Sequence, residues 1–154
     1  VLAVLSGYDN DPIKEYKKNV VLGKKGGKPV VKTLFPGRKN GKLTGVAFEV
    51  TGQGYHGSIG IMVGIDLINN TLTGMRVMTH SETPGLGARA VEPSFYEQFS
   101  GLKPDEIALS DKGGKINAIS GATMTSSGVV GAVKQAMELY LLFKDKILKA
   151  LGTG

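Results

Sequence analysis

The sequence predicts a single α+β domain, in which an antiparallel sheet is flanked by helices and the last helix is long. Three observations predict this fold class. Glycine accounts for 23 of the 154 residues and is spread between apolar runs, which indicates many turns. Two turn signals, Asn40-Gly41 and Asn69-Asn70, each separate two strand-like runs. Apolar residues then recur at helical spacing over residues 126–151.

The segment before the first hairpin gives weaker signals. Asp11-Pro12 is typical of a helix start, so we expect a short helix over residues 9–20. Residues 21–28 are rich in glycine and lysine and are expected to form a flexible loop. Residues 29–34 are expected to be extended.

The middle of the chain predicts an antiparallel meander of strands near residues 43–50, 58–66 and 71–79. Asn40-Gly41 is the strongest short-range hairpin signal, and asparagine also tolerates the positive φ of a tight turn. Apolar and other residues alternate within the first of these strands, as expected where one face of a sheet is buried.

The C-terminal half predicts a short helix over residues 93–100, a short apolar strand over residues 116–119 and the long helix over residues 126–151. Gly128 and Gly131 lie in the first turns of that helix, where each costs about 1 kcal/mol relative to alanine. We expect glycine there because another part of the chain comes close to the helix.

Charge is distributed unevenly along the chain. The net charge is +6, and residues 1–42 hold ten lysine or arginine residues against three acidic ones. Residues 14–42 favour contact with anionic lipid head groups or an acidic partner, although a solvated surface explains such a stretch equally well. Few aromatic residues interleave with these charges and no nucleic-acid module is recognisable, so nucleic acid is not an expected partner.

The available residue types restrict the chemistry. The chain has no cysteine, which excludes disulfides, iron–sulfur ligation and thiol nucleophiles. Two histidines without a clustered acidic set predict no transition-metal site. No apolar run approaches the roughly 18 residues of a membrane-spanning helix. No general base, nucleophile or substrate pocket can be assembled from these residues, so no independent catalytic site is evident.

The run Asn117–Ser126 is the most informative segment. It passes from apolar residues through small and hydroxyl residues directly into the long helix. A helix start presents unpaired N–H groups and the positive end of the helix dipole, which favour an anion such as a phosphate. Gly121 and Ala122 permit close approach, and Thr123 places a hydroxyl there. An ordinary hydroxyl-rich N-cap explains the same residues.

Three blocks of the sequence resemble one known family. The motif at residues 120–126, Ser-Gly-Ala-Thr-Met-Thr-Ser, resembles the flavinylation site of an FMN-binding domain. That domain occurs in the G subunit of the Rnf electron-transport complex and the C subunit of the sodium-translocating NADH:quinone oxidoreductase. Residues 80–87 are similar to the family's Glu-Thr-Pro-Gly-Leu-Gly flavin loop, and residues 54–66 to its Gly-Tyr-x-Gly-x-Ile and Val-Gly-Ile-Asp segments. The resemblance spans about residues 34–142 and is stronger to the Rnf protein.

The resemblance implies an FMN cofactor, which a separate flavin transferase joins to Thr123 through a phosphoester bond. Protein made without that transferase is expected to lack FMN. The family signature has aspartate at the position of Asn117; we expect asparagine to hold the turn almost as well, because the rest of the motif is intact. The implied cofactor-binding residues form three groups: Ser120, Gly121, Ala122, Thr123, Thr125 and Ser126 in the turn; Glu82, Thr83, Gly85, Leu86 and Gly87 in the loop; and Tyr55 and His56.

Individual roles within the loop follow from the chemistry of its residues. Glu82 and Thr83 are expected to offer hydrogen bonds to the pyrimidine edge of a flavin, and Leu86 an apolar face. His80 is expected to be packed or capped, because this is the commoner role of such a residue. Arg89 could neutralise a flavin anion, but we expect it to pair with a nearby carboxylate.

By this resemblance residues 34–154 form the FMN-binding domain, and residues 1–33 form a basic segment that follows a membrane anchor absent from the sequence. The expected function is electron transfer by FMN in a membrane-bound, ion-translocating complex of the Rnf type. The expected partners are other subunits, the flavin transferase and the membrane surface, on the extracytoplasmic (periplasmic) side. A non-covalent FMN-binding sensor or regulatory domain is the alternative, and a phosphate binder without a redox role is a third.

Overall fold

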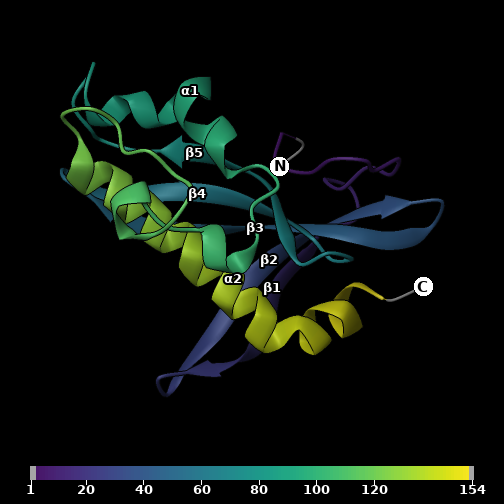
Figure 1. Cartoon of the computed structure of the whole chain (residues 1–154). Helices are drawn as coiled ribbons and strands as arrows, with labels where there is room; N and C mark the ends of the chain where they lie inside the picture. The colour runs from purple at the N-terminus through teal and green to yellow at the C-terminus, as the bar shows by residue number, and fades with distance from the viewer. Residues whose placement is uncertain (1–2, 153–154) are drawn as a thin grey trace.

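The computed structural model of the protein describes residues 3–152 and is built around one antiparallel sheet (Figure 1). Its five strands follow one another in sheet order as they do in sequence, and they form the predicted meander. The strands are β1 Lys17–Lys25, β2 Lys28–Lys39, β3 Lys42–Gly54, β4 Gly57–Asp66 and β5 Thr71–Thr79. The predicted α+β class, with a long C-terminal helix against the sheet, is confirmed.

Both asparagine turns are confirmed as hairpin connections. Asn40 and Gly41 have φ of 54° and 79°, and they join β2 to β3 with Lys39 paired to Lys42. Asn70 has φ of 57° in the connection from β4 to β5. Positive φ at these positions is what asparagine and glycine tolerate and most residues do not.

The predictions for residues 9–20 and 21–28 are wrong. Asp11 begins only a single turn, and residues 17–25 form strand β1. The expected loop is a two-residue hairpin at Gly26-Gly27, with φ of 61° and 80°, which pairs Lys25 with Lys28. Two successive positive φ values give a two-residue turn whose twist matches the twist of the flanking strands. Backbone pairing with β2 therefore becomes possible for residues 17–25, and it outweighs the weak local helix signal.

The helical segments comprise one long helix and several short turns. The longest is α2 Thr123–Leu151; the short α1 Pro93–Tyr96 continues into a 3₁₀ turn, η2 Glu97–Phe99. Other 3₁₀ turns are η1 Gly87–Val91, η3 Pro104–Glu106 and η4 Ser110–Lys112. Within residues 3–152, no helix has the length and apolar character needed to cross a membrane.

The predicted strand over residues 116–119 is also wrong, because only a single parallel bridge joins Ile116 to Leu109. Side chains take up the backbone amides that a strand partner would use. The Asn117 N–H donates to Gln98 Oε1 at 2.7 Å, and the Ile119 N–H donates to Ser126 Oγ at 2.8 Å. The chain therefore reaches α2 as a side-chain-anchored segment outside the sheet.

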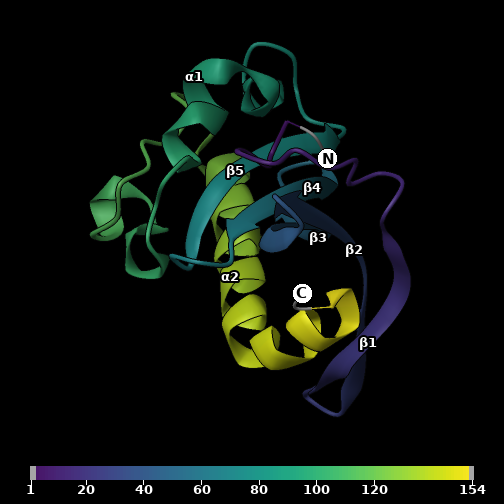
Figure 2. The ribbon, with the colours of Figure 1, turned by 90° about the vertical axis from the view of Figure 1, so that its right-hand side faces the viewer.

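Helix α2 packs against one face of the sheet, where it contributes Val129, Val133 and Met137 to the main core (Figure 2). The helix approaches β3 closely: a Cβ added to Gly52 would lie 2.7 Å from the Gly128 carbonyl oxygen. This close approach explains Gly128 as expected. It does not explain Gly131, which is exposed and has no neighbouring atom within 4 Å of an added Cβ.

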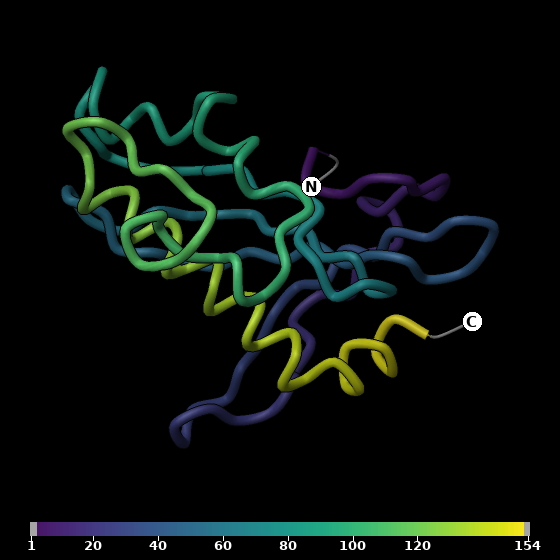
Figure 3. The backbone as a smooth tube through the Cα atoms, in the orientation of Figure 1, coloured from purple at the N-terminus to yellow at the C-terminus, as the bar shows by residue number. Residues whose placement is uncertain are grey.

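Helix α2 bends near its C-terminal end, as the tube in Figure 3 shows, and its last turns lie beside β1 in Figure 2. The bend coincides with Phe143, whose φ of −112° and ψ of 21° are not helical. The Phe143 ring packs so tightly over Gly23 of β1 that an added Cβ on Gly23 would lie 2.5 Å from ring atom Cε1. The bend thus lets the last turns of α2 pack against β1, so that Ile147 and Leu151 join the same core cluster as Leu22.

A buried polar contact fixes the middle of α2 to the β4–β5 turn. The Tyr140 hydroxyl donates to Asn70 Oδ1 at 2.5 Å, and Lys144 Nζ donates to the same oxygen at 2.9 Å. Burial, and secondarily the negative charge of Asp66, raises the pKa of Tyr140 to about 12. The folded protein therefore favours the protonated phenol.

Tyr140→Phe is expected to lower the free energy of unfolding by about 1 kcal/mol at neutral pH, because one buried hydrogen bond is lost. The folded-state pKa of Tyr140 lies above its ordinary value of 10.0, so the protonated hydroxyl stabilises the fold fully below pH 10, and this contribution is lost as pH rises toward 12. Urea unfolding of both proteins across that range measures the difference. A gap between the two proteins that does not change with pH would contradict this account.

Candidate functional site

The three blocks that the sequence singles out meet at one pocket of about 550 Å³. One wall comes from the β3–β4 turn, a second from the loop after β5, and a third from the start of α2. The lining residues are Tyr55, His56, Glu82, Thr83, Leu86, Gly87, Gly121, Ala122, Thr123, Met124 and Thr125. Segments far apart in sequence thus form a single concave site, the usual form of a cofactor site.

The start of α2 is shaped as an anion-binding end. The N-cap residue is Ala122, and no side chain caps the first turn. The hydroxyl-rich N-cap that we weighed as an alternative is therefore not formed. Gly121 has φ of 77°, which allows the chain to turn sharply into the helix. Thr123, the first helical residue, is exposed at the pocket.

Ser126 stabilises this turn from the inside. Its side chain is fully buried; Oγ accepts from the Ile119 N–H and donates to the Ala122 carbonyl, both at 2.8 Å. Ser126 therefore sets the path of the backbone that presents Thr123, and it does not line the pocket.

Glu82 joins all three walls of the pocket. It lies in the loop after β5, and its side chain is 6% exposed. Glu82 Oε1 accepts from the Tyr55 N–H at 2.7 Å and from the Thr125 hydroxyl at 2.5 Å, while Oε2 accepts from the His56 N–H at 2.8 Å. One carboxylate therefore binds the β3–β4 turn and helix α2 to its own loop.

The Glu82 carboxylate is ionised at neutral pH. Burial by itself raises its pKa. Hydrogen bonds from Thr125, His56 and Tyr55, with the nearby charge of His56, outweigh burial and hold the pKa of Glu82 below its ordinary value. The network that joins the walls is thus made by the charged form and weakens as pH falls through that lowered pKa.

Two glycines make room for this carboxylate. An added Cβ on Gly54 would overlap Glu82 Oε1, and one on Gly87 would lie 2.8 Å from Glu82 Cβ and 2.7 Å from Thr125 Oγ1. Glycine at these positions therefore lets the turn, the loop and the helix converge on Glu82.

The outer part of the pocket is apolar and exposed. Tyr55, Leu86 and Met124 have exposed fractions of 67%, 44% and 59%. The His56 ring lies edge-on to Tyr55, with the ring centroids 4.8 Å apart, and its Nε2 is 3.0 Å from Thr83 Oγ1. An open, apolar rim around a polar floor suits a planar cofactor with one polar edge.

The structure brings together all but three of the site residues predicted from sequence. Ser126 is buried beneath the turn, Gly85 forms the tip of its loop with φ of 77°, and Ser120 lines a separate hollow beside Arg89 and Asn117. Met124 lines the pocket although we did not predict it; it occupies the variable position of the motif, and its place directly after Thr123 is the signal that points to it.

The predictions for two neighbouring residues are confirmed. His80 is capped, since its Nδ1 accepts from the Glu82 N–H at 3.1 Å. Arg89 pairs with Glu92, with Nε 3.6 Å from Oε2. Neither side chain lines the pocket.

Comparison with known proteins identifies this arrangement. The family described as the FMN-binding domain matches residues 54–138, more than half of the chain, and the match includes all three walls of the pocket. The chain belongs to the FMN-binding domain family. The matched region begins at the end of β3, so β1 and β2 lie outside it.

Relatives of this FMN-binding domain carry a common name. This chain is 40% identical over 112 residues to the G subunit of the ion-translocating oxidoreductase complex of Methanosarcina acetivorans. The match covers 73% of this chain and 60% of that protein. The chain is 34% identical over 152 residues to the protein of the same name from Aliivibrio fischeri, with 92% and 70% covered. The chain thus spans well under the full length of the first relative.

Solved structures share the fold. NqrC of Shewanella oneidensis superposes with a TM-score of 0.64 at 24% identity, covering 79% of this chain and 63% of that one. The C subunit of the Na⁺-translocating NADH-quinone reductase of Parabacteroides distasonis gives 0.58 at 24% identity, covering 80% and 64%. The five-stranded sheet with its long helix is therefore an architecture that these proteins also have.

Proposed function

We propose that this domain carries FMN as an electron-transfer group in a membrane-bound, ion-translocating redox complex of the Rnf type. The observation that carries the proposal is the single pocket formed by three separate family motifs around an exposed Thr123. FMN, when bound, supplies redox chemistry that this chain's own side chains lack. The protein contributes a binding site, an orientation and an electrostatic environment.

The residues of the pocket fit the parts of FMN. The uncapped start of α2 suits its phosphate, because first-turn N–H groups and the helix dipole both favour an anion. The apolar rim of Tyr55, Leu86 and Met124 suits the flat ring, and the Thr83 hydroxyl is available at the polar side. A volume of about 550 Å³ lies within the range of small-molecule cofactor sites.

The finer part of the proposal is a covalent bond between FMN and Thr123. The phosphoester forms when the Thr123 oxygen attacks the phosphorus of an activated FMN donor, in which a phosphoanhydride joins the FMN phosphate to a second phosphate group. The P–O bond to that second group breaks, the second group leaves, and the hydroxyl proton of Thr123 passes to solvent; a separate flavin transferase is the proposed catalyst. Thr123 is exposed, and it begins the helix whose first turn is uncapped. These features support Thr123 as the acceptor.

The test is flavin fluorescence of the protein on a denaturing gel after co-expression with a flavin transferase. A fluorescent band is expected. FMN that co-purifies but is released on denaturation would favour the non-covalent sensor or regulatory domain instead. Protein that neither gains nor binds FMN would contradict the proposed function altogether.

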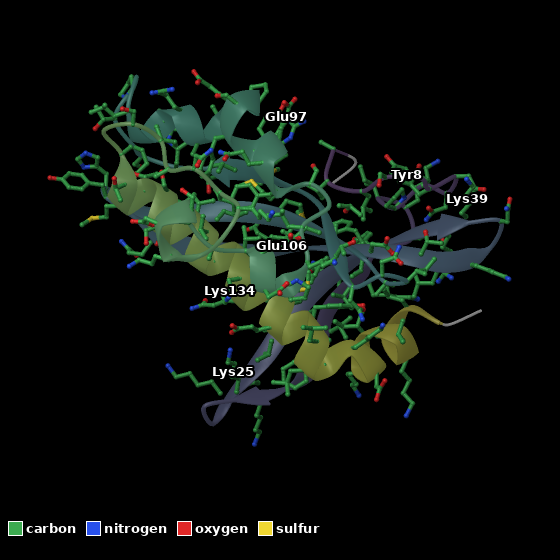
Figure 4. All side chains as sticks on the ribbon, viewed as in Figure 1. Tyr8, Lys25, Lys39, Glu97, Glu106 and Lys134 are labelled. Carbon is green, nitrogen blue, oxygen red and sulfur yellow. The ribbon has the colours of Figure 1, made fainter. Side chains whose placement is uncertain are left out.

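We also propose that the β1–β2 hairpin faces the anionic surface of the membrane. In this proposal the domain lies on the extracytoplasmic side and contacts other subunits of the complex. The tip of the hairpin extends past α2 at the lower left of Figure 4, with Lys25 near this tip. Lys17, Lys18, Lys24, Lys25 and Lys28 are all exposed, and within the described residues none is ion-paired. Val21 and Val31, a cross-strand pair between them, are 54% and 44% exposed. Lysines around exposed valines suit lipid head groups above an apolar layer.

Reversing two of these charges, Lys24→Glu with Lys25→Glu, is expected to weaken binding to phosphatidylglycerol vesicles by roughly tenfold or more, since each lysine near such a surface contributes about 1 kcal/mol. Co-sedimentation measures this. The matched control, Lys103→Glu with Lys112→Glu, makes the same change in net charge away from the hairpin and should bind like the wild type. Equal loss in both double variants would show that net charge alone determines binding, and would contradict the assignment to the hairpin.

A further inference from the structure

Glu82 has a place in the pocket that its sequence motif does not explain. Both of its oxygens are already bonded to protein donors, from Tyr55, His56 and Thr125. These donors come from the two walls that do not contain Glu82 itself. A side chain used in this way holds the pocket together, and its charge stays in the floor of the site.

That charge has no lysine or arginine partner in the floor of the pocket. Among the described residues that line the pocket, Glu82 is the only carboxylate, and none is lysine or arginine. The ion pairs of the described chain are Arg38–Glu15, Arg89–Glu92 and Lys115–Glu106, and none of them involves Glu82. Hydrogen bonds disperse the negative charge but do not cancel it, and at 6% exposure water screens it little.

We infer that Glu82 is a positioning residue that assembles the pocket and, through its fixed negative charge, lowers the reduction potential of the flavin held there. This rests on the proposed function, since it concerns FMN in this pocket. Full reduction by dithionite adds two electrons and one proton from water to the ring and leaves it with one more negative charge. A buried carboxylate beside the ring opposes that charge and so favours the oxidised form.

Variants can separate the structural role of Glu82 in assembling the pocket from the effect of its charge on the reduction potential. Glu82→Gln keeps the size of the side chain but removes the charge, and it places an amide N–H₂ against one of the backbone N–H donors. Thr125→Val removes one hydrogen bond to the carboxylate and keeps the charge. A purely structural role predicts that both variants loosen the pocket and move the potential in the same direction. A role for charge predicts that they differ.

The experiment is a redox titration of the FMN-loaded chain and its two variants at about pH 8, above the ordinary pKa of histidine. The other titratable groups that face Glu82 are His56, from the β3–β4 turn, and His80, after β5; α2 contributes only the neutral Thr125 hydroxyl. The midpoint potential of Glu82→Gln is expected to shift to more positive values. That of Thr125→Val is expected to stay unchanged or to become more negative.

A second measurement uses the wild type and does not depend on the folding of a variant. By linkage, if the carboxylate disfavours reduction, reduction must disfavour the carboxylate, so the pKa of Glu82 should be higher in reduced than in oxidised protein. Carbon NMR of the labelled carboxyl group reads that pKa directly. Equal pKa values in the two states, or equal shifts of potential in both variants, would overturn the inference. Failure of the wild type to hold FMN at all would instead count against the proposed function.

Discussion

Thr123→Ala is expected to abolish covalent attachment of FMN completely, while leaving the fold intact. Thr123 is exposed at the first position of α2, and its side chain makes no hydrogen bond within the described part of the chain. Removing its hydroxyl therefore deletes the acceptor without disturbing the packing. Intact-mass spectrometry after co-expression with the transferase should show one added FMN on the wild type and none on the variant.

Matched variants separate the hydroxyl from its surroundings. Ser127→Ala removes an exposed hydroxyl from the next turn of the same helix, outside the flavin pocket, and should be labelled like the wild type. Thr123→Ser keeps a hydroxyl at the same point and is expected to retain some labelling. FMN on Thr123→Ala, or its loss from Ser127→Ala, would place the attachment elsewhere.

We expect the residue at position 117 to affect the rate of FMN attachment more than its final yield. Its backbone is fixed to Gln98 on both sides: the Asn117 N–H donates to Gln98 Oε1 at 2.7 Å, and Gln98 Nε2 donates to the Asn117 carbonyl at 3.2 Å. The Asn117 side chain is exposed, so the turn does not depend on it. Asn117→Asp is therefore expected to change the rate of labelling, through recognition by the transferase, more than the final yield. An unmodified wild type beside a fully modified Asn117→Asp would contradict covalent attachment in this chain.

The sequence was informative where one short motif fixes a local geometry. Asn40-Gly41 predicted its hairpin because the two residues tolerate positive φ, and the turn before Thr123 was recognisable because few sequences combine those residues. The sequence-based prediction was wrong where contacts with residues far away in the chain determine the secondary structure. Residues 17–25 are a strand only because β2 lies beside them, and residues 116–119 lose a strand because Gln98 and Ser126 take their amides.

The role of Glu82 shows the same limit within the site. Its motif suggested a group that points at the flavin edge. Its actual partners are Tyr55, His56 and Thr125, which lie 27, 26 and 43 residues away in sequence. No local pattern carries that information, so the sequence predicted membership of the site and could not predict what the carboxylate does there.

The second large effect is expected at Gly128, where α2 crosses β3. An added Cβ on Gly128 would overlap the Gln53 carbonyl oxygen, and the neighbouring atoms are backbone, which cannot rotate out of the way. Gly128→Ala should therefore force the helix away from the sheet and lower the free energy of unfolding by about 3 kcal/mol, at the upper end of typical overpacking. Because Gln53 precedes Gly54 and Tyr55 in the pocket wall, the same shift should separate the pocket walls and reduce FMN labelling at Thr123.

Gly131 supplies the control one turn further along the same helix. It is exposed, and an added Cβ has no neighbour within 4 Å, so Gly131→Ala should stabilise the protein by about 0.5–1 kcal/mol through the better helix propensity of alanine. Urea unfolding of the two variants measures effects of opposite sign from the same substitution. If Gly128→Ala were as stable as Gly131→Ala, helix α2 would have to lie further from β3 than this structure places it, and the convergence of the three pocket walls on Glu82 would lose its support.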